Sequence, residues 1–222
     1  MTTRLFLIRH GSTVLSAEDR FAGSTDVELS AAGQHQAEAL AQRLADDHIT
    51  VVYASPMRRT VATAAIVGQP HGLAPILRDG LREIDHGRWE GLRRSDVEIQ
   101  YADEYASWEE DPYIFAPAGG ESGISVLARA MPVVREIVLQ HTGENVAVVS
   151  HKATIRLIIS SLLGFDARGY RDRLDQSPAC LNVIDFKDAV RARLMLFNDV
   201  SHYVDQPPRA EGHLSKWWDR PA

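Results

Sequence analysis

Short apolar runs alternate with longer amphipathic segments along this chain. The short runs are continuous and rich in leucine, isoleucine and valine, which indicates strands buried on both faces, as in parallel sheets. The longer segments are typical of helices, because Ala37, Leu40, Ala41 and Leu44 recur at helical spacing. We predict strands at residues 4–9, 50–54, 76–77 and 145–150, and helices at residues 30–47, 56–68, 124–141 and 153–163. Strands that alternate with helices predict a layered α/β domain with a mainly parallel sheet.

A few residues predict how these helices begin or bend. Ser30 is a suitable N-cap for the first helix, and Ser55-Pro56 has the form of an N-cap followed by a first helical residue. Pro132 falls inside the helix at 124–141. Because proline has no amide proton to donate, we expect it to kink or divide that helix.

The last third of the chain predicts an antiparallel edge to the sheet. Residues 181–186 and 192–197 are strand candidates joined by a turn near 187–189. An exposed face on the strand near 181–186 would allow a homodimer. A helical, aromatic insert covers about 93–110 and a tail covers about 204–222. No repeat or linker interrupts the pattern, so we expect residues 1–222 to form a single domain.

Composition narrows the class of protein. Of the 222 residues, 45% are hydrophobic and 24% charged, which is ordinary for a soluble globular protein. A net charge of −6 argues against a nucleic-acid partner. The most apolar stretch, residues 157–165, is too short to span a membrane. With one cysteine and no signal-peptide pattern, the protein is expected in the cytoplasm.

Charged and nucleophilic residues follow three of the predicted strands directly. They are Arg9-His10-Gly11, then Ser55 with Arg59, and finally Ser150-His151. In open α/β sheets, ligands bind at the carboxyl ends of the strands. We therefore expect these three strand ends to form one site.

The residue types suit phosphoryl transfer, which needs a nucleophile, fixed positive charge and an acid. Arg9 and Arg59 can each bind two phosphate oxygens through the planar guanidinium. His10 can attack through one ring nitrogen while the other donates to a backbone carbonyl. His151, if protonated, would complete the positive lining. Glu83 is the best candidate for the proton donor.

Several motifs occur in a fixed order between about residues 4 and 165. They are Arg9-His10-Gly11-Ser12-Thr13, Asp26-Val27-Glu28-Leu29-Ser30 with Gly33, Ser55-Pro56-Met57-Arg58-Arg59 with Thr63-Ala64, Leu81-Arg82-Glu83 with Gly87-Arg88-Trp89-Glu90-Gly91, Gly119-Gly120-Glu121-Ser122, and Val149-Ser150-His151. In these motifs the chain resembles the histidine phosphatase superfamily, the phosphoglycerate mutase-like proteins.

The resemblance implies a three-layer α/β/α sandwich and a chemistry that uses no metal or other cofactor. It implies that His10 becomes a phosphohistidine and that Glu83 serves as acid and then as base. Arg9, Arg59 and His151 would hold the phosphoryl group. The sequence itself has no His-Glu-x-x-His pattern that would indicate a metal site.

Departures from the family pattern indicate which branch of the family the chain resembles. Val14-Leu15 and Asp85-His86-Gly87 differ from the residues usual in cofactor-dependent phosphoglycerate mutases. Both differences disfavour a mutase. Together with residues 176–182 and 198–202, Asp85-His86-Gly87 resembles the metal-independent phosphoserine phosphatase-like branch. Family spacing selects Arg59 for the site and leaves Arg58 as a solvated helix charge.

The expected substrate-binding residues are less distinctive. They are Gly11, Thr13, Ser16, Gly23, His86 and Lys152. Lys152 replaces the glycine usual after the second family histidine, and either reaches a second anionic group or is a solvated residue at a helix start. For His86 and His202 the alternative is a structural or solvated role, and Trp89 and Trp108 are expected to be packing residues.

These observations predict a phosphomonoester hydrolase that acts on a small, soluble phosphorylated metabolite. L-phosphoserine is the leading candidate, with sugar phosphates, phosphoglycerates and α-ribazole phosphate as alternatives. Two other functions compete with hydrolysis. One is a mutase that returns the phosphoryl group to another hydroxyl, and the other is a phospho-ligand binder without turnover.

Overall fold

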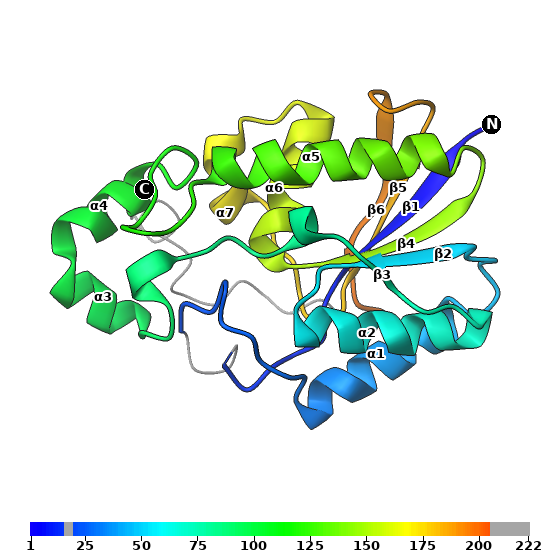
Figure 1. Cartoon of the computed structure of the whole chain (residues 1–222), viewed down its shortest axis with the longest axis horizontal. Helices are drawn as coiled ribbons and strands as arrows, with labels where there is room; N and C mark the ends of the chain where they lie inside the picture. Colours follow the sequence, from blue (N-terminus) through cyan, green and yellow to red (C-terminus); the bar gives the residue numbers. More distant parts are fainter. Residues whose placement is uncertain (16–19, 205–222) are drawn as a thin grey trace.

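The computed structural model describes residues 1–15 and 20–204, and these form a six-stranded mixed sheet with helices on both sides (Figure 1). The strands are β1 (Thr3–Arg9), β2 (Val51–Ala54), β3 (Ile76–Leu77), β4 (Asn145–Ser150), β5 (Leu181–Phe186) and β6 (Ala192–Asp199). Their order is β3-β2-β4-β1-β5-β6. The first four in this order are parallel, β5 runs antiparallel to β1, and β6 runs antiparallel to β5. The predicted α/β class with an antiparallel edge is confirmed.

Helices on the two faces of the sheet make three layers (Figure 1). One face is covered by α1 (Ala31–Arg43) and α2 (Arg58–Gly68), and the other by α5 (Gly123–Gln140) and α6 (Lys152–Leu163), with the short α7 (Tyr170–Arg173) beside α6. The helices α3 (Arg94–Gln100) and α4 (Ala102–Glu110) lie beyond one end of the sheet (Figure 1). Phe6 and Ile8 of β1 join the core under α1 and α2, whereas Leu5 and Leu7 join the core under α5 and α6. Because both faces are covered, β1 is apolar at every one of these positions.

Ser30 caps α1 as predicted, with its hydroxyl accepting a hydrogen bond from the amide of Gly33. The prediction for Ser55-Pro56 is wrong, because α2 begins at Arg58 and its N-cap is Met57. The Thr60 hydroxyl, which donates to the carbonyls of Ser55 and Met57, holds the intervening turn. Ser55 is thereby kept at the end of β2, where its hydroxyl lies 2.8 Å from Nε2 of His151.

Pro132 does not divide α5, which is one continuous helix from Gly123 to Gln140. Buried residues on both sides of the proline, including Val126, Ala130 and Val134, pack into the core of the molecule. This packing stabilises the helix although the proline lacks one backbone hydrogen bond.

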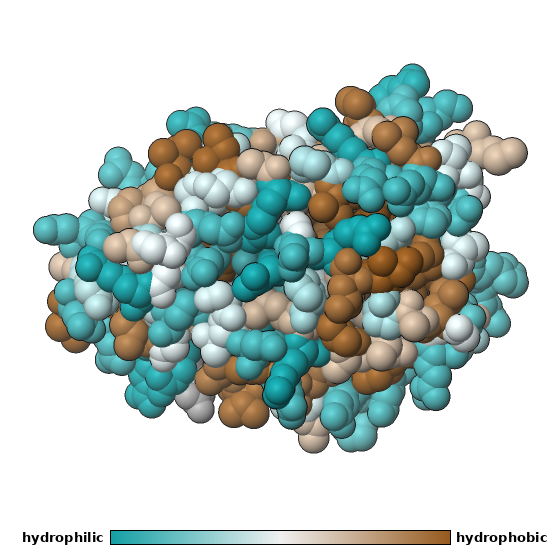
Figure 2. All heavy atoms as spheres, viewed as in Figure 1, coloured by the Kyte–Doolittle hydropathy of each residue, from teal (hydrophilic) through white to brown (hydrophobic). Residues whose placement is uncertain are grey.

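The strand at 181–186 was expected at the sheet edge, and this expectation is wrong. β5 lies between β1 and β6, and Leu181, Val183 and Ile184 are buried. It therefore offers no exposed face for a homodimer. At the opposite edge, Ile76 and Leu77 of β3 are 42% and 46% exposed, and Figure 2 shows apolar atoms gathered on this part of the surface.

The predicted insert forms α3 and α4, which close a small core of their own. Trp89 and Trp108 pack there with Phe21, Val97 and Tyr105. The two tryptophans are packing residues, as predicted. Among the described residues, none of the helices combines the length and apolarity needed to cross a membrane. Ser16 and residues 205–222 of the predicted tail lie outside the described residues.

Candidate active site

Three strand ends meet at one edge of the sheet, as the sequence predicts. Arg9 at the end of β1 lies opposite Ser150 at the end of β4, and the His10 amide donates to the Ser150 carbonyl at 3.1 Å. The Ser55 amide, just after β2, donates to the carbonyl of Val149 at 3.1 Å. The parallel register of β1, β4 and β2 thus brings His10, His151 and Ser55 together.

His10 is buried, and its ring lies edge-on to that of His151 with the centroids 5.2 Å apart. Its Nδ1 is 2.7 Å from the carbonyl oxygen of Gly11. Because a carbonyl only accepts, Nδ1 carries the proton, and Nε2 of the neutral ring has the free lone pair. Burial, followed by the charges of Arg9 and Arg59, lowers the pKa of His10 well below its usual value. The ring is therefore neutral near pH 7 and has an unprotonated Nε2.

Gly11 allows the chain to pass close to the start of α1. A Cβ at this position would lie 2.3 Å from the carbonyl oxygen of Gly33. The Gly11 amide donates to the hydroxyl of Thr63, which in turn donates to the carbonyl of Arg59. The backbone beside His10 is thus tied to α2, the helix that carries Arg59.

Arg59 enters the site from the first turn of α2 and is 2% exposed. One side of its guanidinium is anchored, with Nη1 donating to the Thr25 carbonyl at 2.8 Å and Nη2 to the Gly23 carbonyl at 2.9 Å. Its Nε donates to Nδ1 of His151 at 3.2 Å. The loop around residues 23–25 therefore positions the arginine, which the sequence did not reveal.

His151 is a neutral ring in this structure. Its Nδ1 accepts from Arg59, so the proton lies on Nε2, which is 2.8 Å from the Ser55 hydroxyl. Burial, followed by the charge of Arg59, lowers the pKa of His151 well below its usual value. The fixed positive charge at these strand ends thus comes from Arg9 and Arg59 and not from His151.

Arg9 reaches the site from β1 and is 9% exposed. Its Nη1 donates to the carbonyl of Gln176 at 2.5 Å, whereas its buried Nε has no partner. Burial lowers the pKa of Arg9, and Cys180 and Glu83 act in the opposite direction. The guanidinium is held at one end only and keeps donors for an anion.

Glu83 lies against the first turn of α6. Its carboxylate oxygens accept from the amides of Ala153 and Thr154, each at 3.1 Å, and from the Thr154 hydroxyl at 3.2 Å. These donors are two and three residues beyond His151 in the chain. The charge of Glu83 also acts on the pKa of both Arg9 and Arg59. The carboxyl group is therefore part of the same site.

The remaining predicted residues fall into different settings. Thr13 is buried beside Leu29, with which it forms an isolated bridge. The ring of His86 packs edge-on against Phe21, and burial lowers its pKa. Lys152 is not simply solvated at the helix start, since its Nζ pairs with Asp175 at 3.3 Å.

Glu90 lies within the motif Gly87-Arg88-Trp89-Glu90-Gly91, but the sequence did not disclose that it holds the loop at residues 23–25. Its carboxylate accepts from the amides of Gly23, Ser24, Thr25 and His86 and from the Thr25 hydroxyl. Burial alone would raise the pKa of Glu90, but these hydrogen bonds outweigh it and the pKa is lowered. Glu90 thus holds the loop that anchors Arg59.

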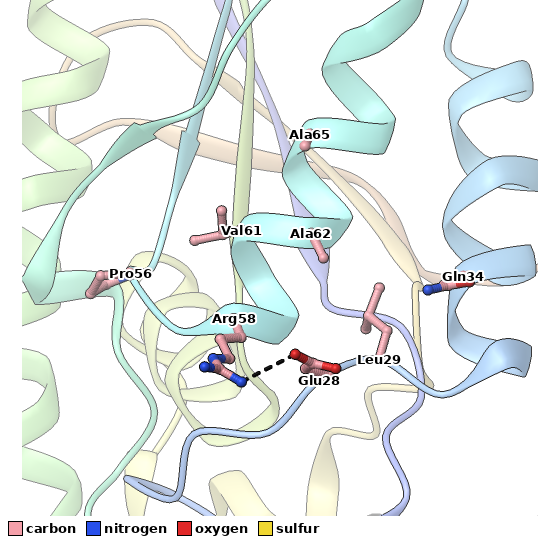
Figure 3. A pocket seen from close by; sticks show the side chains of 8 residues that line it. All are labelled: Glu28, Leu29, Gln34, Pro56, Arg58, Val61, Ala62 and Ala65. Carbon is pink, nitrogen blue, oxygen red and sulfur yellow. Dashed lines mark hydrogen bonds and ion pairs between the residues drawn. The ribbon is translucent and has the colours of Figure 1, made fainter.

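A separate cleft of about 510 Å³ lies between the start of α2 and the loop before α1 (Figure 3). It is lined by Glu28, Leu29, Gln34, Pro56, Arg58, Val61, Ala62 and Ala65. Arg58 is exposed there and pairs with Glu28 at 3.1 Å, so it is a solvated helix charge as predicted. None of the predicted catalytic residues lines this cleft.

The described residues contain no group of three or more histidine, cysteine, aspartate or glutamate side chains that could hold a metal ion. The site instead combines two arginines, two neutral imidazoles and one carboxyl group around three strand ends. The family model of the histidine phosphatase superfamily (branch 1) matches residues 5–200.

The chain belongs to the histidine phosphatase superfamily. It is 36% identical over 163 residues to phosphoserine phosphatase 1 of Hydrogenobacter thermophilus, covering 73% of this chain and 77% of that protein. It is 33% identical over 168 residues to glucosyl-3-phosphoglycerate phosphatase of Mycolicibacterium vanbaalenii, covering 72% and 74%. The α-ribazole phosphatase structure from Shigella flexneri superposes with a TM-score of 0.81 at 27% identity, covering 89% of this chain and 96% of that one.

These similarities confirm the resemblance drawn from the motifs. They also establish the class of enzyme, a phosphatase of this superfamily. The named relatives differ in substrate, so family membership alone does not specify the molecule that this phosphatase hydrolyses.

Proposed function

We propose that this protein is a metal-independent phosphomonoester hydrolase that forms a phosphohistidine on His10. The observation that carries the proposal is the hydrogen bond from His10 Nδ1 to the Gly11 carbonyl. It leaves the lone pair of Nε2 free in a buried site where Arg9 and Arg59 also lower the pKa of the ring. A neutral, oriented imidazole beside two fixed cations suits attack on a phosphate ester.

In the first step, Nε2 of His10 bonds to phosphorus and the ester P–O bond breaks. Protonated Glu83 gives its proton to the leaving alkoxide. Arg9 and Arg59 stabilise the charge on the equatorial oxygens. The phosphate dianion would raise the pKa of His151 and favour its protonated form, which adds a further donor.

In the second step, water attacks phosphorus and the P–N bond breaks. The Glu83 carboxylate accepts a proton from the water, and the electron pair returns to Nε2 of His10. Inorganic phosphate then leaves, and the enzyme is back in its starting protonation state. Arg9, His10 and His151 lie at strand ends, Arg59 lies on the first turn of α2, and Glu83 lies against the first turn of α6.

We propose L-phosphoserine as the leading substrate. A relative named phosphoserine phosphatase 1 shares 36% identity with this chain, and another relative is named for glucosyl-3-phosphoglycerate. Both named compounds carry a carboxylate as well as a phosphate. α-Ribazole phosphate, which lacks a carboxylate, is the alternative represented by the solved structure.

Phosphate release from a panel of phosphorylated metabolites, with and without a chelator, tests the proposal. We expect hydrolysis of O-phospho-L-serine to be unaffected by chelation. His10→Ala should lower kcat by roughly 10³-fold or more, whereas His35→Ala, on the exposed face of α1, should not. Full activity of His10→Ala, or loss of wild-type activity on chelation, would refute the mechanism. Isomerisation of a phosphoglycerate without phosphate release would indicate a mutase.

A further inference from the structure

Two cations beside the phosphoryl site share a single carboxylate. Nζ of Lys152 lies 3.3 Å from Oδ1 of Asp175, and Nη2 of Arg156 lies 3.0 Å from the same oxygen. Lys152 and Arg156 stand one turn apart at the start of α6, on the same face of the helix. One carboxylate therefore faces two positive charges and can neutralise only one of them.

A third cation approaches the same place from β1. Arg9 donates to the carbonyl of Gln176, the residue after Asp175. Burial lowers the pKa of both Lys152 and Arg156, and the charge of Arg9 acts in the same direction on each. Even with Asp175 ionised, the cluster keeps an excess of positive charge next to the phosphoryl site.

The members of this cluster differ in how firmly they are held. The side chain of Arg156 is 6% exposed, and its buried Nε has no hydrogen-bond partner. The side chain of Asp175 is 55% exposed and that of Lys152 is 37% exposed. Arg156 is thus enclosed by the protein, Lys152 is partly exposed, and the carboxylate that faces them lies at the solvent boundary.

We propose that Lys152 and Arg156 form a second anion subsite, which binds a carboxylate of the phosphorylated substrate. Asp175 occupies this subsite in the unliganded protein and gives way to the substrate. Arg9 of the phosphoryl site contacts Gln176, the residue after Asp175, so the subsite adjoins the strand end at which the phosphoryl group would bind. This inference rests on the proposed function and restricts its substrates to phosphorylated carboxylic acids.

Two substrates that differ only in the carboxylate test the proposal. O-phospho-L-serine and O-phosphoethanolamine share the phosphate, the amine and the two-carbon chain. We expect the wild-type enzyme to prefer phosphoserine in kcat/KM. Lys152→Met should lower this preference about tenfold, mainly by raising KM for phosphoserine. Lys187→Met, a change at the exposed lysine of the β5–β6 turn, should keep the wild-type preference.

Asp175→Asn distinguishes a carboxylate that competes with the substrate from an ion pair that only stabilises the fold. If Asp175 competes with the substrate carboxylate, its removal should lower KM for phosphoserine several-fold. If the ion pair only holds the segment before β5, its removal should raise KM for both substrates. The proposal would also be overturned if Lys152→Met lowered kcat/KM equally for both substrates, or for neither.

Failure of the proposed function gives a different result. An enzyme that releases no phosphate from p-nitrophenyl phosphate would contradict hydrolysis itself. Calorimetric binding of the same two compounds then tests the subsite separately: tighter binding of phosphoserine that is lost in Lys152→Met supports it, and equal binding overturns it. An active enzyme that does not distinguish the two compounds would refute the subsite alone.

Discussion

Nε of Arg59 donates a hydrogen bond to Nδ1 of His151 across 3.2 Å. This bond fixes the second histidine of the site as the neutral tautomer, with its proton on the nitrogen that faces the Ser55 hydroxyl. The guanidinium supplies the positive charge and the imidazole does not. Arg59 therefore orients its neighbour, and under the proposed function it also binds the phosphoryl group.

Arg59→Lys should separate charge from geometry. Lysine keeps the positive charge but cannot contact His151, Thr25 and Gly23 at the same time. We expect kcat/KM to fall roughly 10²-fold, as for loss of one preorganised donor. The neighbouring change Arg58→Lys, at an exposed position, is the matched control and should leave steady-state kinetics unchanged. Equal kinetics for the two variants would contradict the role given to Arg59.

Glu83→Gln should expose the need for a proton donor. The amide can no longer protonate a leaving alkoxide, so kcat for O-phospho-L-serine should fall about 10²–10⁴-fold. p-Nitrophenolate leaves without protonation, so kcat for p-nitrophenyl phosphate should fall much less. Steady-state assays of both substrates measure the difference. The assignment is wrong if both substrates lose activity to the same extent.

Glu90→Gln should loosen the loop that anchors Arg59. The glutamate accepts from three successive amides of this loop, and glutamine can replace only part of this set. We expect a loss of about 1–3 kcal/mol in the free energy of unfolding together with a higher KM. Urea titrations give the first quantity, and Glu110→Gln, at an exposed position on α4, serves as the control. Unchanged stability would show that Glu90 is dispensable.

Stability should fall as the pH drops below about 6.5. The pKa values of His10 and His151 are lowered in the folded state, so the unfolded chain binds protons in this range and the folded protein does not. The proton excess of the unfolded state makes the free energy of unfolding decrease with falling pH. His86 and His202 act in the same direction.

Unfolding free energies measured between about pH 7.5 and 5 check this slope. The carboxylates with lowered pKa, such as Glu90 and Glu121, lose their contribution only at lower pH, and Lys152, with a pKa of about 8, contributes only at the upper end, so the histidines dominate the slope below about pH 7. His10→Asn should flatten the curve by removing one titrating group. A free energy that stays level or rises toward pH 5 in the wild type would contradict the neutral state assigned to the two rings.

The strand-end residues were accessible from sequence because they follow continuous apolar runs. Such runs indicate parallel strands, and parallel strands place their carboxyl ends at one edge. Arg9, His10 and His151 could therefore be brought together without coordinates. Glu83 does not directly follow such a strand, so its place in the site was expected mainly from the family resemblance.

Other features depend on long-range packing that local patterns do not encode. The position of β5 inside the sheet depends on its pairing with β1, at the other end of the chain. Ser55 looked like a helix cap, but its hydroxyl is used by His151 instead. Glu90 binds a loop 65 to 67 residues earlier in the chain, so no short motif could disclose its partners. In each case the deciding partner is distant in sequence.

The central claim is that the phosphoryl group passes through His10. Rapid quenching of the enzyme during turnover of a radiolabelled phosphate ester, followed by peptide mapping under alkaline conditions, tests it most directly. We predict an acid-labile, base-stable label on the peptide that contains His10, and no label in His10→Ala. Steady turnover with no trapped phosphoenzyme, or with the label on another residue, would contradict the account.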